Sequence, residues 1–102
     1  MTGNAPDRVT VTVEGERVGL DGTIGFDNAP GILDEVNRAI RSTPSITIDL
    51  GQVRRSNSAG LALLIEWLAE ARRHGHSVRY ERVPEGLRQI ARVCQVEALL
   101  NA

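Results

Sequence analysis

Several residue types are scarce or missing in this 102-residue chain, and each absence excludes a class of function. All 12 basic residues are arginine. Without lysine the chain cannot form Schiff bases, and it cannot build the phosphate-binding loop G-x-x-x-x-G-K-[ST] of nucleotide hydrolases. Only three aromatic residues are present and the net charge is −1, so nucleic acid is not an expected partner despite the basic pairs Arg54-Arg55 and Arg72-Arg73.

Cysteine and long apolar segments are equally scarce. Cys94 is the single cysteine, so no internal disulfide can form, and the chain suits a reducing compartment. The first residues lack the basic and apolar regions of a secretory leader, and the longest aliphatic run, residues 61–65, is too short to span a bilayer. We therefore expect a cytoplasmic protein without direct membrane insertion.

In length and overall composition, the chain is typical of one globular domain. We expect a flexible tail over residues 1–7 and a single domain over residues 8–102. Valines alternate with polar residues from Val9 to Val13, and the alternation resumes at Val18 after Gly15-Glu16, which predicts a hairpin with one buried face.

Helical and strand patterns then follow in turn. Apolar spacing predicts a helix over residues 28–42, capped by Asp27 or Asn28 and ended by Pro44. The remaining predictions are a strand at 45–50, a loop at 51–57, a main helix that opens on Asn57-Ser58 and has Gly75 as its C-cap, a strand at 77–81, a helix from about residue 84 and a packed turn at 96–100. This β-β-α-β-α-β-α order predicts an α/β fold with a four-stranded mixed sheet and packed helices.

The main helix has an apolar stripe, a charged face and two large apolar residues between them. Leu63 and Trp67 lie at this boundary, whereas Glu66, Glu70 and Arg73 fall on the charged face. The two boundary residues have two interpretations: partial burial against a neighbouring helix, or a hot spot for binding a partner.

Ser58, at the start of the main helix, also has two interpretations. A hydroxyl there can accept a phosphate, which the helix N–H groups and the nearby Arg54 or Arg55 would stabilise. Alternatively, Asn57 or Ser58 simply caps the helix, because asparagine and serine are common N-caps. The residue types alone favour the cap.

No catalytic or metal-binding set accompanies Ser58. His74 and His76 flank a predicted helix end but lack the further ligands of a tetrahedral site, so we predict no metal or cofactor. The helical spacing of Cys94 indicates a small core residue. Asp49 and Glu66 are carboxylates that nothing in the sequence brings together. A small enzyme that uses Cys94 or the histidines stays a third alternative.

Two segments resemble a known family. The run IDLGQVRRSNSAGLALLIEWLAEARRHG, residues 48–75, is similar to the central strand, loop and helix of STAS domains, in which [D/N]-[S/T]-x-G-L begins the helix. The run VPEGLRQIARVCQVEALL, residues 83–100, is similar to the closing helix of the family. The resemblance extends from Val9 to Leu100 and implies a non-enzymatic binding domain.

Within STAS domains, the G-L-A-L-L segment is most similar to the small subunit of the bacterial Mla phospholipid transporter, which maintains lipid asymmetry. That branch implies docking on an ABC-transporter ATPase at the inner face of the inner membrane. The other similar branch, the anti-sigma-factor antagonists, implies docking on an anti-sigma kinase and phosphorylation of Ser58. The partner-binding residues expected from the resemblance and the helix pattern are Arg54, Arg55, Ser56, Asn57, Ser58, Leu63 and Trp67.

Asn57 departs from the pattern of the antagonist branch, which usually has aspartate before its phosphorylated serine. Members of the Mla type commonly have Asp-Thr at these two positions, so Asn57 does not discriminate between the branches. Phosphorylation of Ser58 therefore stays an open prediction.

Overall fold

The computed structural model describes residues 8–101, so the tail expected at residues 1–7 lies outside the described residues. The order of elements confirms the predicted β-β-α-β-α-β-α pattern. The elements are β1 (Val9–Glu14), β2 (Arg17–Ile24), α1 (Ala29–Ser42), β3 (Ser45–Ser56), α2 (Ser58–Arg73), β4 (Ser77–Glu81), α3 (Glu85–Val93) and the short 3-10 helix η1 (Glu97–Asn101).

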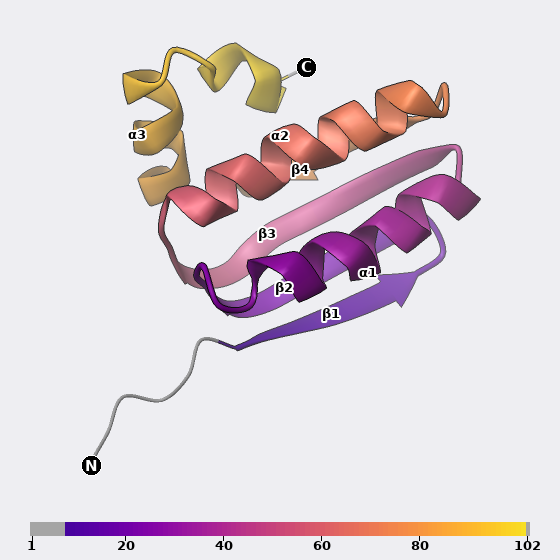
Figure 1. Ribbon diagram of the computed structural model, residues 1–102, viewed down its shortest axis with the longest axis horizontal. Coiled ribbons are helices and arrows are strands. Elements are labelled where there is room, and N and C mark those ends of the chain that lie inside the picture. The colour runs from indigo at the N-terminus through magenta and orange to yellow at the C-terminus, as the bar shows by residue number, and fades with distance from the viewer. Residues whose placement is uncertain (1–7, 102) are drawn as a thin grey trace.

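The four strands form one mixed sheet in the order β1-β2-β3-β4, as predicted. β1 and β2 are antiparallel, whereas β2, β3 and β4 are parallel to one another. Each parallel pair is connected through a helix, so α1 and α2 run side by side in the same direction over the sheet (Figure 1). Both helices therefore begin at the same end of the molecule.

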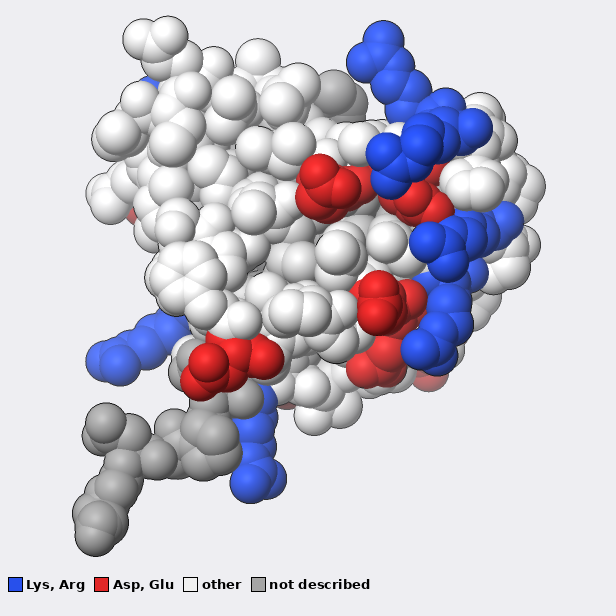
Figure 2. All heavy atoms as spheres, in the orientation of Figure 1, with Lys and Arg blue, Asp and Glu red and all other residues white. Residues whose placement is uncertain are grey.

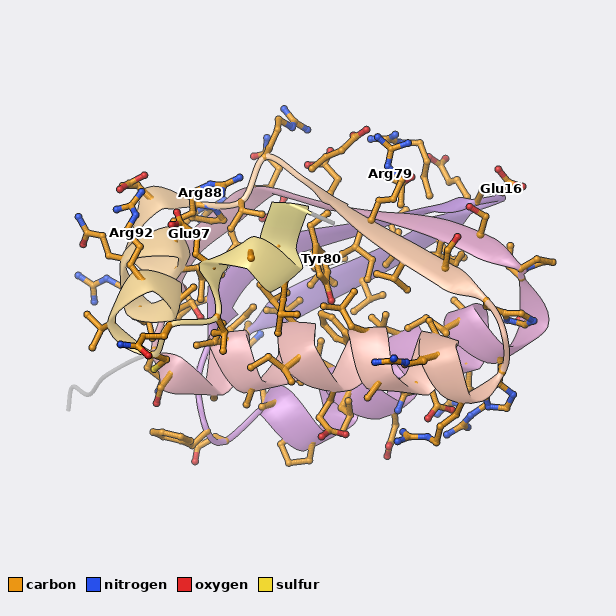
Figure 3. The ribbon with its side chains drawn as sticks, turned by 90° about the horizontal axis from the view of Figure 1, so that it is seen from above. Glu16, Arg79, Tyr80, Arg88, Arg92 and Glu97 are labelled. Carbon is orange, nitrogen blue, oxygen red and sulfur yellow. The ribbon has the colours of Figure 1, made fainter. Side chains whose placement is uncertain are left out.

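The sheet is apolar on the face under the helices. The alternation of strand side chains places Val18 and Leu20 of β2 beside Ile46, Ile48 and Leu50 of β3, all of them buried. Tyr80 of β4 points toward α2 (Figure 3), and its hydroxyl donates a hydrogen bond of 2.6 Å to the carbonyl oxygen of Leu64. Burial raises the pKa of Tyr80 well above its usual range, so the hydroxyl keeps its proton and fixes α2 against the sheet.

The opposite face of the sheet is charged. Arg17 Nη2 lies 2.7 Å from Glu81 Oε1, and Arg82 Nε lies 3.0 Å from Asp49 Oδ1. The Arg82 guanidinium lowers the pKa of Asp49, and the Arg17 guanidinium lowers the pKa of Glu81. Both carboxylates therefore form ion pairs on the outer face of the sheet. Asp49 has a structural role there, as the partner of Arg82.

The predicted loop at residues 51–57 is mostly strand, which corrects the sequence interpretation. β3 continues to Ser56, and its polar residues remain paired with β2, from Asp21 opposite Gln52 to Ile24 opposite Ser56. The pairing of β2 with β3 continues across two register shifts. The polar sequence suggested a loop because this part of the strand is largely exposed to solvent.

Two side chains lie elsewhere than predicted. Glu70, expected on the exposed face of α2, is only 4 % exposed, because Arg41 of α1 and Arg73 bind its carboxylate. Cys94, expected in the core, is exposed, because α3 ends at this residue. The predicted final turn is confirmed as η1, and its Leu100 is buried.

Helix α2 ends one residue earlier than predicted. His74 is the C-cap, and Gly75 follows it with a φ of +69°. The N–H of His76 donates to the carbonyl of Ala71, and that of Gly75 donates to the carbonyl of Arg72, which together form a Schellman motif. Over residues 8–101, no helix combines the length and apolar character that crossing a bilayer requires.

Candidate partner-binding site

The start of α2 presents an exposed serine. Asn57 is the N-cap, and its Oδ1 accepts a hydrogen bond of 2.8 Å from the backbone N–H of Ala59. Ser58 is the first residue of the helix and is exposed. Because Asn57 supplies the cap, the Ser58 hydroxyl is not needed for capping, and none of the hydrogen bonds within residues 8–101 involves it.

Gly60 shows why the S-x-G spacing suits this site. A Cβ atom at position 60 would lie 1.9 Å from Ser56 Oγ and 3.1 Å from Leu87 Cδ2. The first turn of α2 therefore packs directly on the end of β3 and on α3. This contact fixes the position of Ser58 relative to the strand that precedes it.

Arg54, Arg55 and Ser56 lie on the final residues of β3 and thus close to the start of α2. Arg54 and Arg55 are exposed, and Arg54 Nη2 lies 3.6 Å from Asp21 Oδ1 on the neighbouring strand. The fold thus brings all five predicted polar site residues, 54–58, to one corner of the molecule. Neither residues 58–60 nor the first turn of α1 includes an acidic side chain.

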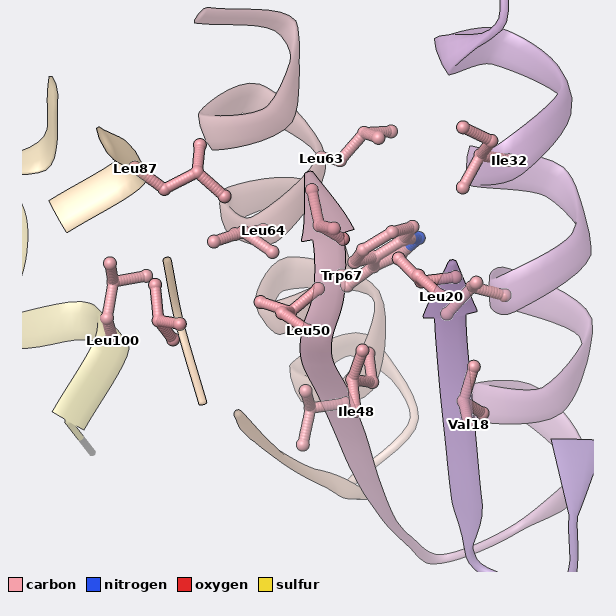
Figure 4. Close-up of a cluster of buried hydrophobic side chains, with 14 of the residues drawn as sticks. Val18, Leu20, Ile32, Ile48, Leu50, Leu63, Leu64, Trp67, Leu87 and Leu100 are labelled. Atoms are coloured by element: carbon pink, nitrogen blue, oxygen red, sulfur yellow. The ribbon is translucent and has the colours of Figure 1, made fainter. Parts of the chain in front are cut away.

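Leu63 and Trp67, the two residues with alternative interpretations, are both buried. Trp67 has no exposed surface and Leu63 is 4 % exposed, so neither side chain lies open at the edge of the helix. Figure 4 shows Trp67 in the core between α2 and α1, and its Nε1 donates to the Leu33 carbonyl oxygen at 3.4 Å. The burial interpretation holds for both residues because α1 packs along this side of α2.

An apolar groove of about 440 Å³ lies beside Ser58, between the N-terminal halves of α1 and α2. Phe26, which precedes α1, is 68 % exposed and lines it. Pro30 and Leu33 of α1 and Ala62 and Leu63 of α2 complete most of the lining, with Glu66 as the charged member. The sequence analysis missed this groove, although a lone phenylalanine in a turn between Gly25 and Asp27 is a signal for exposed aromatic surface.

Charged side chains are distributed unevenly over the face of the molecule that α1 and α2 cover. Figure 2 shows that charged side chains gather toward the end where α1 and α2 finish, whereas much of the surface over the helix starts is uncharged. At the charged end, the Arg73 and Arg41 guanidinium groups lower the pKa of Glu70 to about 2. The groove therefore lies in the less charged half of the molecule.

Both histidines make polar contacts within the fold. His74 Nε2 lies 3.2 Å from Glu70 Oε2, and His76 Nδ1 lies 2.7 Å from the carbonyl oxygen of Ile40. In the described part of the chain, no three histidine, cysteine or acidic side chains come together in an arrangement able to hold a metal ion.

The chain matches one family model and is similar to several solved structures. The family model described as Mlab, STAS domain, matches residues 8–101. The MlaB subunit in the structure of the Acinetobacter MlaFEDB complex in an ATP-bound conformation is 26% identical, with a TM-score of 0.69, over 83% of this chain and 90% of that subunit.

The anti-sigma factor antagonist SpoIIAA, in its unphosphorylated form, has the same fold. Its TM-score is 0.68 at 13% sequence identity, over 92% of this chain and 84% of SpoIIAA. None of the curated proteins compared with the chain matches it. STAS domains are generally regulatory or binding domains and not enzymes. Because the family model covers the described residues from end to end, the chain belongs to the STAS domain family.

Proposed function

We propose that this protein is the STAS subunit of an Mla-type phospholipid ABC transporter and that it docks on the cytoplasmic ATPase of that transporter. The observation that carries the proposal is the apolar groove that opens beside the exposed Ser58. The likeness to the MlaB subunit of the MlaFEDB complex supports the class of partner. No catalytic step is assigned to this chain.

The proposed docking surface combines an apolar anchor with a polar margin. Phe26 and Leu33 offer apolar area from the α1 side, and large apolar side chains at the centre of an interface contribute most of the binding energy. Arg54, Arg55, Ser56, Asn57 and Ser58 form the margin at the end of β3. Leu63 contributes through the floor of the groove, and Trp67 contributes indirectly, because it holds α1 against α2.

The test is copurification of the tagged chain with the ATPase encoded beside it. Ser58→Arg would place a long cation over the groove, and Phe26→Asp would place a charge at its anchor. Each substitution is expected to weaken binding by about 30-fold or more, corresponding to about 2 kcal/mol.

Val93→Asp is the matched control, because Val93 is 84 % exposed on α3 and does not line the groove. It makes the same kind of substitution as Phe26→Asp on a different surface. Copurification should survive Val93→Asp. Retention of the ATPase by both groove variants would refute the proposed docking surface.

The exposed hydroxyl also favours a second candidate, an anti-sigma-factor antagonist regulated by phosphorylation of Ser58. The first turn of α2 contains no acid, so its N–H groups are well placed to stabilise an added phosphate together with Arg54 and Arg55. This candidate predicts a mass gain of one phosphate on incubation with ATP and the kinase encoded beside it. Ser58→Ala should abolish the gain, and the absence of any gain in the unchanged chain would reject this candidate.

A further inference from the structure

The outer edge of β1 has the properties of a pairing surface. β1 is the outermost strand of the sheet, hydrogen-bonded on one side to β2 (Figure 1). Its sequence, VTVTVE, contains no proline or lysine, the residues that commonly protect such edges. We propose that this edge pairs with the same edge of a second copy of the chain, antiparallel, with Val11 opposite Val11.

The backbone hydrogen bonds of the hairpin fit this register. The Arg8 carbonyl accepts a hydrogen bond of 2.8 Å from the Thr23 N–H, so Arg8 directs its backbone groups toward β2. Because alternate residues of an antiparallel ladder bond to the same neighbour, Val9, Val11 and Val13 direct theirs outward. With Val11 opposite Val11, Val9 lies opposite Val13 of the other copy, and all three outward residues pair with one another.

The charges at the ends of the strand are complementary in the same register. Arg8 lies opposite Glu14 of the second copy, and the two-fold symmetry creates this pair twice. Both residues are exposed, and neither takes part in an ion pair within the described chain. A shift of the register by two residues would separate both pairs, so the charges specify this alignment.

In this register, Val13 of each copy also lies next to a groove on the other copy. This side chain is 51 % exposed although it lies on the helix face of β1. A groove of about 370 Å³ separates β1 from α1, with Val9 and Ile32 in its lining. Because Val13 of the second copy lies opposite Val9, its side chain would enter this groove, where Gly31 leaves open space.

Cysteine cross-linking tests the register directly. Val11→Cys is made in a Cys94→Ser background, since Cys94 is exposed. Directly opposite residues of a hydrogen-bonded pair have Cα atoms about 5.5 Å apart, within disulfide range. Val9→Cys is the matched control, because its copies would lie about 14 Å apart. Oxidation should cross-link the Val11 variant at least tenfold faster, and equal rates would contradict the register.

Charge reversal tests association without oxidation. In sedimentation velocity, the apparent mass of the unchanged chain should rise toward twice the monomer value between micromolar and millimolar concentration. Arg8→Glu and Glu14→Arg should each weaken association at least tenfold, and the combined variant should restore it. A chain that stays monomeric throughout, or a combined variant that fails to recover, would overturn the proposal. The groove beside Ser58 shares no lining residue with this edge, so the two proposals stand or fall separately.

Discussion

At the scale of single residues, Trp67 is the largest fully buried side chain of the described residues, and it lies at the junction of α1 and α2. Its side chain has no exposed surface, and its removal would leave a cavity between the two helices. We expect Trp67→Ala to lower the free energy of unfolding by about 3–5 kcal/mol, measured by urea denaturation. Leu68→Ala, at a half-buried position on the same helix, should cost less. A Trp67→Ala loss no larger than that of Leu68→Ala would contradict this account of the core.

A second residue-scale prediction concerns the ends of α2 and α3. Both helices end in a Schellman motif, but the residue with positive φ is Gly75 after α2 and Gln95 after α3, with φ of +69° and +62°. Glycine adopts this conformation without a steric penalty, whereas glutamine does not. Gln95→Gly should therefore raise the free energy of unfolding by about 0.5–1 kcal/mol.

Gly75→Gln is the reciprocal control for that substitution. It should lower the thermal midpoint while Gln95→Gly raises it, and both are measured in the same calorimetric experiment. Changes of the same sign would contradict the explanation by backbone conformation.

The residue-scale errors of the sequence analysis have physical causes. The helical wheel placed Trp67 correctly between the apolar and charged faces, but it contains no information about α1, whose Leu33 carbonyl lies beside the indole. Spacing likewise assigned Cys94 to the apolar side of α3 without showing that the helix ends there. Periodicity specifies a direction on the helix, whereas burial depends on which neighbour lies in that direction.

At the scale of elements, Glu70 connects the C-terminal halves of α1 and α2. Its carboxylate lies 2.5 Å from Arg41 Nε on α1 and 2.6 Å from Arg73 Nη2 on its own helix. These guanidinium groups lower its pKa from 4.5 to about 2, so the folded state favours the ionised form. This contribution to stability is fully present above about pH 4.5 and is lost as the pH falls toward 2.

The test compares urea unfolding of the unchanged chain and Glu70→Gln across that range. The unchanged chain should be the more stable at neutral pH, and the difference should shrink as the pH decreases from about 5 to about 2. A difference that is independent of pH would show that the carboxylate charge does not connect the helices.

The extension of β3 shows what the sequence could not predict at this scale. Its first half, with Ile46, Ile48 and Leu50 inside, has the alternation of a half-buried strand and was predicted. Its second half carries exposed polar residues, and it remains a strand because β2 continues beside it through two register shifts. Val53 is the one buried residue of this half, and a single apolar residue among exposed ones gives no alternation from which a strand could be predicted.

At the scale of the whole molecule, the order of the elements and the mixed sheet followed from apolar patterning and from the resemblance to STAS domains. The groove did not, because it joins Phe26 and Leu33 to Ser58 and Ala62, which belong to different elements. The parallel direction of α1 and α2 brings their beginnings together at one end. The polar residues of the site, 54–58, were predictable because they are contiguous in the sequence. The apolar residues of the groove could be identified only from the folded structure.

The location of Trp67 gives the protein an optical property. The single indole of the chain lies in the core between the helices that form the groove, one helical turn from Leu63 in the groove floor. Its fluorescence therefore reports on the junction of α1 and α2 without any label. A ligand or partner that shifts one helix against the other would change the emission, so docking could be followed in unmodified protein and in real time.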